Sequence, residues 1–375
     1  MPDWRVEKSA LTGLHFGHQV LFAGGKIPEN YNRNIFSRVY EIKWNVKARY
    51  GIPIYWNAVK KQFQRILTDA RPDIIHAHNI FSAKMISEFD IPFVYDDHEY
   101  WSKSSEVLRE IEEQNSNNIN QENSSYIRSK LERIKRKYIN SRVIKLWTSW
   151  ERELVTSYPT ITVSEQIAHE LRLIVNNQGR IFVVPNFPLY SEVKNLKGPV
   201  RHFGLSSVYA GGDAGNIINF PQKNMDGFTD LFCKHDIGIL TMIGWSGNNS
   251  YASNVKYKGF LSRSCMFDEM SNSSNGLIPW KKHWSHTYSS PNKAYEYAHA
   301  GLFVMCTSSL KPVTKYLEDN CLTFEDYNQM ALLLSYFKDN MEELYHKRIK
   351  IFKFALENLN WEKYEQNIFD AYKIA

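Results

Sequence analysis

The chain has 375 residues, which is long for one hydrophobic core and predicts two domains. Hydrophobic residues make up 43% of it and charged residues 23%, as in a globular protein, and it contains no run of about 18 apolar residues that would predict a membrane span. The net charge of +6 suits anionic partners, but the basic residues form no groove-reading motif, so nucleic acid is not expected as a partner.

The first residues and the cysteines indicate where the protein works. Met1-Pro2-Asp3-Trp4 lacks the basic region and apolar core of a signal peptide. The four cysteines, at 233, 265, 306 and 321, form no Cys-x-x-Cys pair, so they indicate neither a zinc site nor a disulfide framework. We therefore expect a cytoplasmic protein with reduced thiols.

The chain begins with alternating helices and strands. We expect an amphipathic helix over 5–20, a strand at 21–23 followed by a glycine turn, a strand at 39–44 and a helix at 56–70. A doubly wound sheet normally opens with a strand, so this one is expected to lack its first strand. Either the domain has lost an edge, or the start codon is placed too late.

Two short apolar strands then end in polar residues. The strand within 71–79 ends in His76-Ala77-His78-Asn79, and the strand at 91–95 runs into Asp96-Asp97-His98-Glu99. The carboxyl ends of parallel strands meet at the edge where open α/β folds bind ligands. A single histidine there is more often structural, but this cluster predicts a site.

Residues 102–147 interrupt the alternation as a polar and basic helical insertion. Residues 106–113 are helix-like, and the Asn/Ser-rich stretch 114–126 is expected to be a mobile loop. The amphipathic helix expected at 127–147 carries a basic series: Arg128, Lys130, Arg133, Lys135, Arg136 and Lys137. It is either a solvated helix face or a surface for docking on an anionic membrane, where each basic residue is worth roughly 1 kcal/mol.

The alternation resumes after the insertion. Helices are expected at 150–157, 165–175 (with Ser164 as N-cap), 265–270 and 361–372, and strands at 160–163, 180–184, 207–210, 236–243, 255–260, 276–278 and 322–324. The Lys-rich stretch 189–199 is interpreted as the linker. The predicted domains are 1–190 and 200–355, with a C-terminal helix in 356–375 packing back on the first.

The stretch 289–306 is the most informative. Ser290 suits an N-cap, Pro291 the first helical position and Gly301 the helix stop, before a buried parallel strand at 302–306.

Two charges in this helix are unusual. Lys293 lies in the first turn, where the helix dipole disfavours a cation, and Glu296 lies among Ala and Tyr, where a buried carboxylate needs a partner. Both fit a nucleoside diphosphate at the helix N-terminus, with Lys293 neutralising the phosphates and Glu296 binding ribose hydroxyls. The alternative is a solvated lysine and a surface glutamate.

In order, these motifs resemble the GT-B glycosyltransferases, in particular the retaining family 4, often called group 1. The matching pieces are Gly17-His18-Gln19-Val20, 73–79, 95–99, Ile161-Thr162-Val163-Ser164-Glu165, Val184-Pro185-Asn186, Gly276-Leu277-Ile278-Pro279-Trp280, and Ser290-Pro291-Asn292-Lys293 with Glu296-Tyr297 and Gly301. The resemblance implies an α/β fold of two Rossmann-like, doubly wound domains facing a cleft. It also implies a nucleotide sugar bound mainly by the C-terminal domain and an acceptor bound mainly by the N-terminal one.

The resemblance also assigns roles to residues. Glu296 would hold the ribose hydroxyls, and the diphosphate would be held by Ser290, Asn292, Lys293, Gly211 and Gly212. His98 would lie at the reacting sugar, and Asp97 would orient His98 or contact the acceptor. Further acceptor-side candidates are Arg5, His78 and Asn79. No metal or other cofactor is expected.

Three departures from the family pattern stand out. Tyr288 replaces a glutamate that the family often has eight residues before the ribose-binding one. Residues 211–215 contain neither the Arg nor the Lys that many members carry there, and the first strand with its Gly-rich loop is missing.

We expect a hexosyltransferase-type enzyme that transfers a sugar from a nucleoside-diphosphate sugar to a glycan or lipid-linked acceptor, with retention, in the cytoplasm or at the inner face of the membrane. One alternative is a nucleotide-sugar 2-epimerase, which would use Asp96, Asp97 and Glu99 with a histidine for proton abstraction. The other is a catalytically inactive glycosyltransferase-like subunit or scaffold.

Overall fold

The computed structural model describes residues 4–25, 27, 34–118, 126–176, 179–212, 220–245 and 254–375, without the side chains of 112 and 114–137. The chain divides into two compact units: unit 1 is Met1–Pro185 with Tyr364–Ala375, and unit 2 is Asn186–Lys363. The sequence predicts the first domain to end at 190 and the return to it to begin at 356. The stretch 189–199, predicted as the linker, contains the short helix α8 (Tyr190–Val193) and lies within unit 2.

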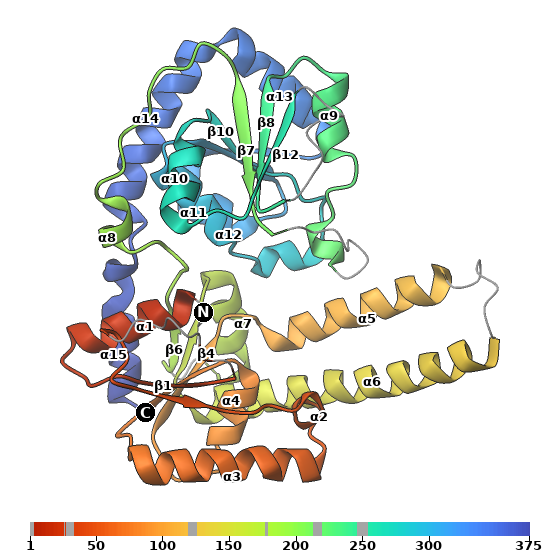
Figure 1. The fold of residues 1–375 in the computed structure, drawn as a ribbon, viewed down its shortest axis with the longest axis vertical. Helices are drawn as coiled ribbons and strands as arrows, with labels where there is room; N and C mark the ends of the chain where they lie inside the picture. Colours follow the sequence, from red (N-terminus) through yellow and green to blue (C-terminus); the bar gives the residue numbers. More distant parts are fainter. Residues whose placement is uncertain are drawn as a thin grey trace. The chain divides into compact units, whose positions relative to one another are not determined.

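Unit 1 contains two parallel sheets covered by helices (Figure 1). The strands are β1 (Leu21–Gly24) and β2 (Arg38–Glu41) in one sheet, and β3 (Ile75–His78), β4 (Phe93–Asp97), β5 (Thr160–Thr162) and β6 (Ile181–Val183), in that order, in the other. The helices are α1 (Trp4–His15), α2 (Val46–Arg49), α3 (Pro53–Ala70), α4 (Ile80–Ile86), α5 (Trp101–Asn118), α6 (Tyr126–Ser157), α7 (Glu165–Ile174) and α15 (Glu365–Lys373). α1 ends at His15, before the predicted limit of 20.

The sheet of unit 1 is split at the place where a first strand is expected. Within the described residues β1 pairs with β2 alone, and β3 with β4 alone. In the doubly wound order 3-2-1-4-5-6 the opening strand lies between the strands that are here β1 and β3. The β1–β2 side has a small core of its own around Ala10, Ile35 and Phe36, against which Phe22 and Val39 also pack. As expected, the described residues of this α/β domain contain no strand between β1 and β3.

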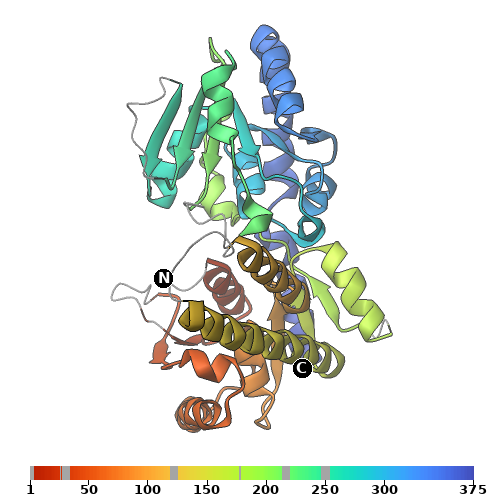
Figure 2. The same ribbon diagram turned by 90° about the vertical axis from the view of Figure 1, so that its right-hand side faces the viewer.

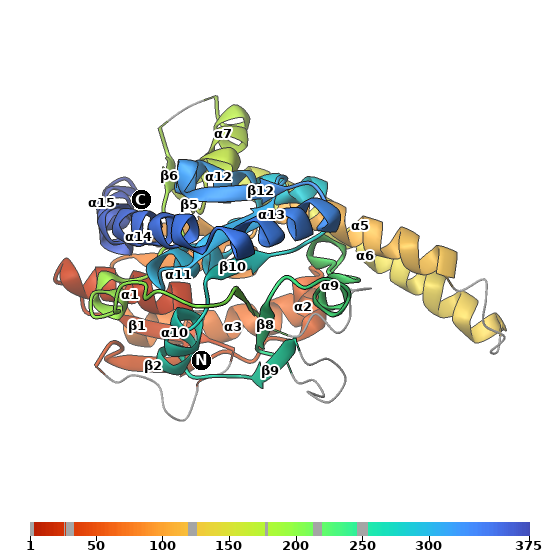
Figure 3. The same ribbon diagram turned by 90° about the horizontal axis from the view of Figure 1, so that it is seen from above.

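The insertion of unit 1 is a long helical hairpin. α5 and α6 run side by side away from the sheet, as Figure 1 and the view from above in Figure 3 both show; in Figure 2 the hairpin points toward the viewer. At its base Phe81 of α4 packs against Trp101 and Trp147, with ring centroids 5.1 and 5.6 Å away. α5 extends into the predicted loop 114–126, of which 119–125 lie outside the described residues.

The two helices predicted at 127–147 and 150–157 are one continuous helix, α6. The predicted ranges leave Thr148-Ser149 between the two helices, and hydroxyl side chains are common at helix ends. In the structure Thr148 Oγ1 donates to the carbonyl of Ile144 (2.9 Å), and Ser149 Oγ donates to that of Leu146 (2.9 Å). Because both hydroxyls bond to carbonyls of the same helix, they do not interrupt it.

Unit 2 is a doubly wound domain with one six-stranded parallel sheet of order β12–β11–β10–β7–β8–β9. The strands are β7 (Ser206–Ala210), β8 (Ile239–Ile243), β9 (Val255–Gly259), β10 (Asn275–Ile278), β11 (Phe303–Thr307) and β12 (Cys321–Phe324). Besides α8, its α-helices are α9 (Phe228–Lys234), α10 (Arg263–Ser271), α11 (Asn292–His299), α12 (Lys311–Leu317), α13 (Tyr327–Asp339) and α14 (Met341–Asn358). Its 3-10 turns are η3 (Pro221–Lys223), η4 (Trp284–Tyr288), η5 (Glu318–Asn320) and η6 (Trp361–Tyr364). The strand order reverses between β7 and β10, which is where open α/β sheets bind ligands.

Tyr297 of α11 bridges these two strands. Their register pairs end at Gly276↔Val208, beyond which the Tyr297 hydroxyl accepts from the N–H of Ala210 (2.7 Å) and donates to the carbonyl of Leu277 (3.4 Å). A Cβ at Gly276 would collide with the Tyr297 ring. Glycine at 276 therefore lets α11 approach the switch point closely.

The start of α11 differs by one residue from the prediction, while its end agrees. Pro291 is the N-cap, and the Ser290 hydroxyl bonds to the hydroxyl of Tyr295 (2.7 Å) instead of capping the helix. Gly301 has φ +69°, the left-handed conformation expected of a helix stop, and β11 is buried throughout. No helix in the described part of the chain is both long and apolar enough to cross a bilayer.

Candidate functional site

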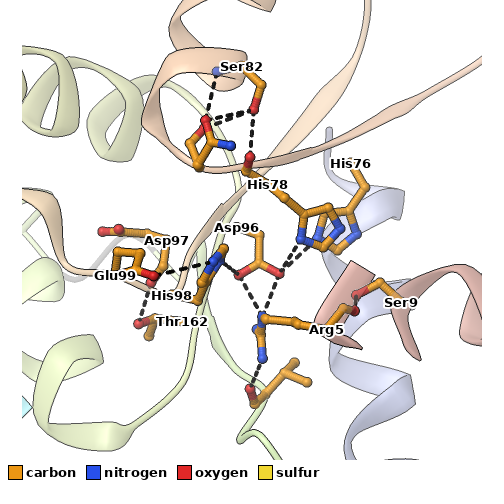
Figure 4. Close-up of polar contacts among 12 residues, drawn as sticks. Arg5, Ser9, His76, His78, Ser82, Asp96, Asp97, His98, Glu99 and Thr162 are labelled. Carbon is orange, nitrogen blue, oxygen red and sulfur yellow. Dashed lines mark hydrogen bonds and ion pairs between the residues drawn. The ribbon is translucent and has the colours of Figure 1, made fainter. Parts of the chain in front are cut away.

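Asp96, at the carboxyl end of β4, is the centre of a buried polar cluster in unit 1 (Figure 4). Arg5 of α1 donates from Nε to both carboxylate oxygens, at 3.0 and 2.8 Å, and from Nη1 to the carbonyl of Val184 (2.9 Å). Burial alone would raise the pKa of Asp96, but the charge of Arg5 and the contacts of three histidines together outweigh it and hold that pKa well below its usual range. The two side chains therefore form an ionised internal pair.

Three histidines surround this carboxylate. His76 Nε2 and His78 Nδ1 lie 3.2 and 3.3 Å from Oδ2, and His98 Nδ1 lies 3.5 Å from Oδ1. Burial and the neighbouring His76 lower the pKa of His78 to about 4, so His78 is neutral at pH 7. Burial would also lower the pKa of His98, but its contact with Asp96 raises it. His98 is thus a candidate proton donor at this edge of the sheet.

Asp97 lies on the other face of β4, because side chains alternate along a strand. Its carboxyl group is fully buried, and burial together with the charge of Glu151 on α6 raises its pKa well above the usual range. Burial also raises the pKa of Glu151. Of the two carboxylates, that of Asp96 contacts His98, so the contact expected for Asp97 is made by Asp96.

The acceptor-side candidates have different surroundings. His78 belongs to the cluster around Asp96, and Arg5 is buried and paired with the same carboxylate. Asn79 caps α4: its side-chain oxygen accepts from the N–H groups of Phe81 and Ser82, at 3.0 and 3.1 Å. The structure therefore gives Asn79 a local structural role.

His76, His78 and Asp96 are also the one set of three potential metal ligands in the described part of the chain whose ligand atoms lie within 4.8 Å of one another. Imidazole and carboxylate groups suit zinc. Arg5, however, already neutralises Asp96, and its guanidinium would lie next to any cation bound there. Repulsion at this range disfavours a divalent metal, so the contacts favour an ion pair.

A second cluster lies in unit 2, at the switch point of the sheet. Lys293 reaches from the first turn of α11 to the end of β7, where its Nζ lies 3.8 Å from the ring centroid of Tyr209 and 5.2 Å from that of Trp280. Burial lowers the pKa of Lys293. For Tyr209, burial would raise the pKa, but the charge and hydrogen bonding of Lys293, together with Trp280 and the charge of Lys223, outweigh burial and lower that pKa. A side chain at Gly211 would collide with the Lys293 ammonium.

Glu296 is 9% exposed and has the partner that a buried carboxylate needs. Its Oε1 accepts from Nη1 of Arg263 on α10 (2.8 Å), and Nε of Arg263 contacts Glu192 of α8. Burial alone would lower the pKa of Arg263, but Glu296 and Glu192 raise it. Glu296 is therefore not a surface glutamate, and the sequence does not single out the arginine that holds it.

Lys223 is a second cation here that was not predicted. It ends the turn η3, with Nζ 6.0 Å from the ring centroid of Trp280, and its charge adds to burial in lowering the pKa of Lys293. His286 anchors this turn, because its Nε2 bonds to the carbonyl of Gln222 (2.6 Å). The prediction considered only 211–215, but the connection after β7 is longer and its lysine follows later in the sequence.

All the predicted donor-binding residues gather at two adjacent places. Gly211 and Gly212 follow β7, and Ser290, Asn292, Lys293 and Glu296 lie at or in α11. Asn292 opens α11 and is exposed, and the first N–H groups of a helix have no partner within it. This edge of unit 2 thus offers backbone donors, two ammonium groups and one carboxylate.

Comparisons with known proteins bear on the fold described above. Residues 14–187 match the model of Glycosyltransferase Family 4. Sucrose-phosphate synthase from Thermosynechococcus elongatus has a similar structure, with a TM-score of 0.69 and 13% identity over 98% of this chain and 92% of that one. A glycosyltransferase from Rickettsia africae has a TM-score of 0.63 and 10% identity, over 100% of this chain and 95% of that one. Anabaena HepE in complex with UDP and glucose has a TM-score of 0.65 and 10% identity, over 100% of this chain and 97% of that one. The curated proteins contain no matching sequence.

Two doubly wound units are typical of the GT-B class of glycosyltransferases, and this chain has the GT-B fold. Within that class it is similar to family 4, as the motifs predict, and the family match covers most of unit 1.

Proposed function

We propose that the protein is a hexosyltransferase-type glycosyltransferase that uses a nucleoside-diphosphate sugar and glycosylates a hydroxyl of a glycan or lipid-linked acceptor with retention. The observation that carries this proposal is the arrangement in unit 2 of a buried Glu296 beside Lys293 and Lys223 at the switch point. A nucleoside diphosphate carries a diol, which suits the carboxylate, and phosphates, which suit the ammonium groups and the helix N-terminus. The Anabaena protein of the same fold was solved with UDP, which supports this choice of ligand.

The chemistry follows from the charges. When the sugar leaves, negative charge develops on the departing diphosphate, and fixed cations aimed at it stabilise the transition state. Lys293 and Lys223 supply that charge, so the proposal needs no metal. His98, whose pKa is raised, would act at the reacting sugar as a hydrogen-bond or proton donor. The acceptor hydroxyl would attack the anomeric carbon from the side that the leaving group vacates, without a protein nucleophile, and its proton would pass to the departing diphosphate.

A panel of nucleotide sugars tests the proposal. With a glycan or lipid-linked acceptor, one donor should give acceptor-dependent release of nucleoside diphosphate, and NMR of the product should show the anomeric configuration of the donor. Lys293→Met should lower kcat/KM by about 100-fold, because it removes one fixed charge from the leaving group. The inactive-subunit alternative predicts that no donor in the panel is turned over.

The alternative 2-epimerase is less well supported. Such an enzyme needs an available carboxylate base beside the sugar. Asp96 is paired with Arg5, and Asp97 is buried with its pKa raised. Deuterium incorporation into a nucleotide sugar without any acceptor would nevertheless favour it.

We also propose that the hairpin docks on an anionic membrane at the cytoplasmic face. The support is the continuous helix α6 and the basic series that the sequence places at 128–137, whose side chains lie outside the described residues. Vesicles containing phosphatidylserine should carry the protein upward in flotation, and changing the six basic residues of the series to Gln should abolish this. Changing the exposed Lys61 and Arg65 of α3 to Gln is the control and should have little effect. Wild-type protein that stays in the soluble fraction would contradict the proposal.

A further inference from the structure

The two lysines of the unit 2 cluster are held against aromatic rings. Lys293 Nζ lies 3.8 Å from the ring centroid of Tyr209, and Trp280 lies near both lysines, 5.2 Å from Lys293 and 6.0 Å from Lys223. The indole N–H of Trp280 donates to the Tyr209 hydroxyl (3.4 Å), which fixes one ring against the other. Both rings are almost completely buried, with 2% of Tyr209 and 5% of Trp280 exposed.

An aromatic ring is an unusual partner for an ammonium group at an anion site. Its negative face attracts a cation, but the ring is neutral and does not compensate the positive charge. A carboxylate in the same place would compete with an incoming phosphate, whereas a ring leaves the ammonium available to it. The carboxylate nearest along the helix, Glu296, is bonded to Arg263. The two lysines repel each other, so something must keep them together before the anion arrives.

The cluster also depends on the absence of a side chain. Gly211 follows β7, and a Cβ built there would collide with the Lys293 ammonium and lie 3.0 Å from the Tyr209 hydroxyl. The φ of Gly211 is not in the left-handed region, so its backbone conformation does not by itself demand glycine. The Lys293 ammonium lies where a side chain at position 211 would be.

We propose that Tyr209 and Trp280 form an aromatic platform that positions Lys293 and Lys223 for the diphosphate of the donor. We also propose that glycine is needed at position 211, because a side chain there would displace the Lys293 ammonium from the platform. The inference rests on the proposed function and adds three positioning residues to it. The platform lies at the ends of β7 and β10, where the strand order reverses.

Calorimetric titration of the full chain with UDP, GDP and ADP, and with the matching nucleosides, tests the inference. The nucleoside reports on the ribose and base contacts, and the diphosphate adds the contacts of the lysines. Trp280→Leu and Gly211→Ala should each weaken binding of the diphosphate by on the order of tenfold while leaving nucleoside affinity within about twofold. Trp280→Phe keeps a ring and should restore most of the loss. Phe260→Leu, at an aromatic residue 84% exposed in the same unit, is the control and should bind as wild type.

A double-mutant cycle shows whether Trp280 acts through the lysine. In a Lys293→Met background, Trp280→Leu should cause a much smaller further loss, because the ammonium it positions is gone. Equal losses in both backgrounds, or equal losses of nucleoside and diphosphate affinity, would overturn the inference. If the Trp280→Leu variant does not fold, the affinity of the Gly211→Ala variant for nucleoside diphosphate tests the inference, since that variant keeps both rings. A wild-type protein that binds nucleoside diphosphate, with Gly211→Ala binding it equally well, refutes the platform alone; a wild-type protein that binds none refutes the proposed function as well.

Discussion

Asp96 has more ionisable neighbours than any other residue in the polar cluster of unit 1. It is fully buried, paired with Arg5, and in contact with three histidines. A buried charge that loses its partner is costly, since neither water nor another charge replaces the lost interaction. The stability of unit 1 should therefore depend on this pair.

Asp96→Asn should lower the free energy of unfolding by about 3 to 5 kcal/mol, because the buried guanidinium of Arg5 loses its counter-charge. The measurement is urea denaturation followed by circular dichroism. Combining Asp96→Asn with Arg5→Met should recover part of the loss, since the double variant buries no unmatched charge. A change below about 0.5 kcal/mol in the single variant would be typical of a surface site and would contradict this account.

The bridge formed by Arg263 gives a second prediction at the residue scale. Arg263 contacts both Glu192 and Glu296 through different nitrogens, a geometry that the single ammonium of lysine cannot reproduce. Arg263→Lys should therefore weaken nucleoside binding about 3- to 10-fold through misplacement of Glu296. Isothermal titration with nucleosides measures it. Arg201→Lys, at an exposed pair with Glu342 in the same unit, is the matched control and should have no effect. Equal affinities for all three proteins would show that Arg263 does not position Glu296.

At the scale of elements, two buried carboxyl groups join β4 to the helical hairpin. Asp97 and Glu151 both have raised pKa values in the folded state, with burial as the largest cause. Each is therefore protonated more readily in the folded than in the unfolded chain. Their contribution to stability is fully present below the unfolded-state pKa of about 4 and is lost as the pH rises through the folded-state values.

Glu151→Gln should accordingly make stability less dependent on pH. Gln keeps the oxygen that accepts from the N–H of Ser102 but removes one titrating group. We expect the Tm difference, variant minus wild type, to be small near pH 4 and to grow in favour of the variant up to pH 8. Thermal unfolding at several pH values measures this difference. Asp96, whose pKa is lowered in the folded state, affects stability in the opposite direction, but it is present in both proteins and cancels in the difference. A difference that does not change with pH would show that the pair does not titrate as described.

The elements show what the sequence could and could not predict. Continuous apolar runs predict the buried strands of both units, because parallel strands are covered on both faces. The short helix α4 was not predicted, although Asn79 before an apolar run is a recognisable N-cap signal. The break predicted within α6 was wrong, because the choice between helix end and helix interior at Thr148-Ser149 depends on where the hydroxyl groups bond.

The candidate sites were predicted where the signal is local in the sequence. Glu296, Lys293 and His98 lie in motifs a few residues long. Arg5 and Asp96, by contrast, are 91 positions apart, and Arg263 and Glu296 are 33 apart, so only the fold brings them together. Lys223 was missed for the same reason: its closeness to Lys293 depends on a long connection that no local pattern describes.

Across the whole chain, the two units differ in the continuity of their sheets. Unit 2 has the full doubly wound strand order, whereas the sheet of unit 1 is split between β1 and β3 within the described residues. The proposed donor contacts all lie in unit 2, and His98 lies in unit 1. Donor binding by unit 2 can therefore be measured without assuming anything about unit 1.

Calorimetric titration of the wild-type chain and of Glu296→Gln with UDP, GDP and ADP shows whether Glu296 binds a nucleoside diphosphate. We predict that the wild type binds at least one of them with a Kd in the micromolar to millimolar range. Glu296→Gln should weaken that binding by roughly 2 kcal/mol, about 30-fold, because a charged acceptor for the ribose hydroxyls is lost. Glu269→Gln, at a glutamate of α10 paired with Lys258, is the control and should bind as wild type. If the wild type binds no nucleoside diphosphate, or Glu296→Gln binds it equally well, the claim is contradicted.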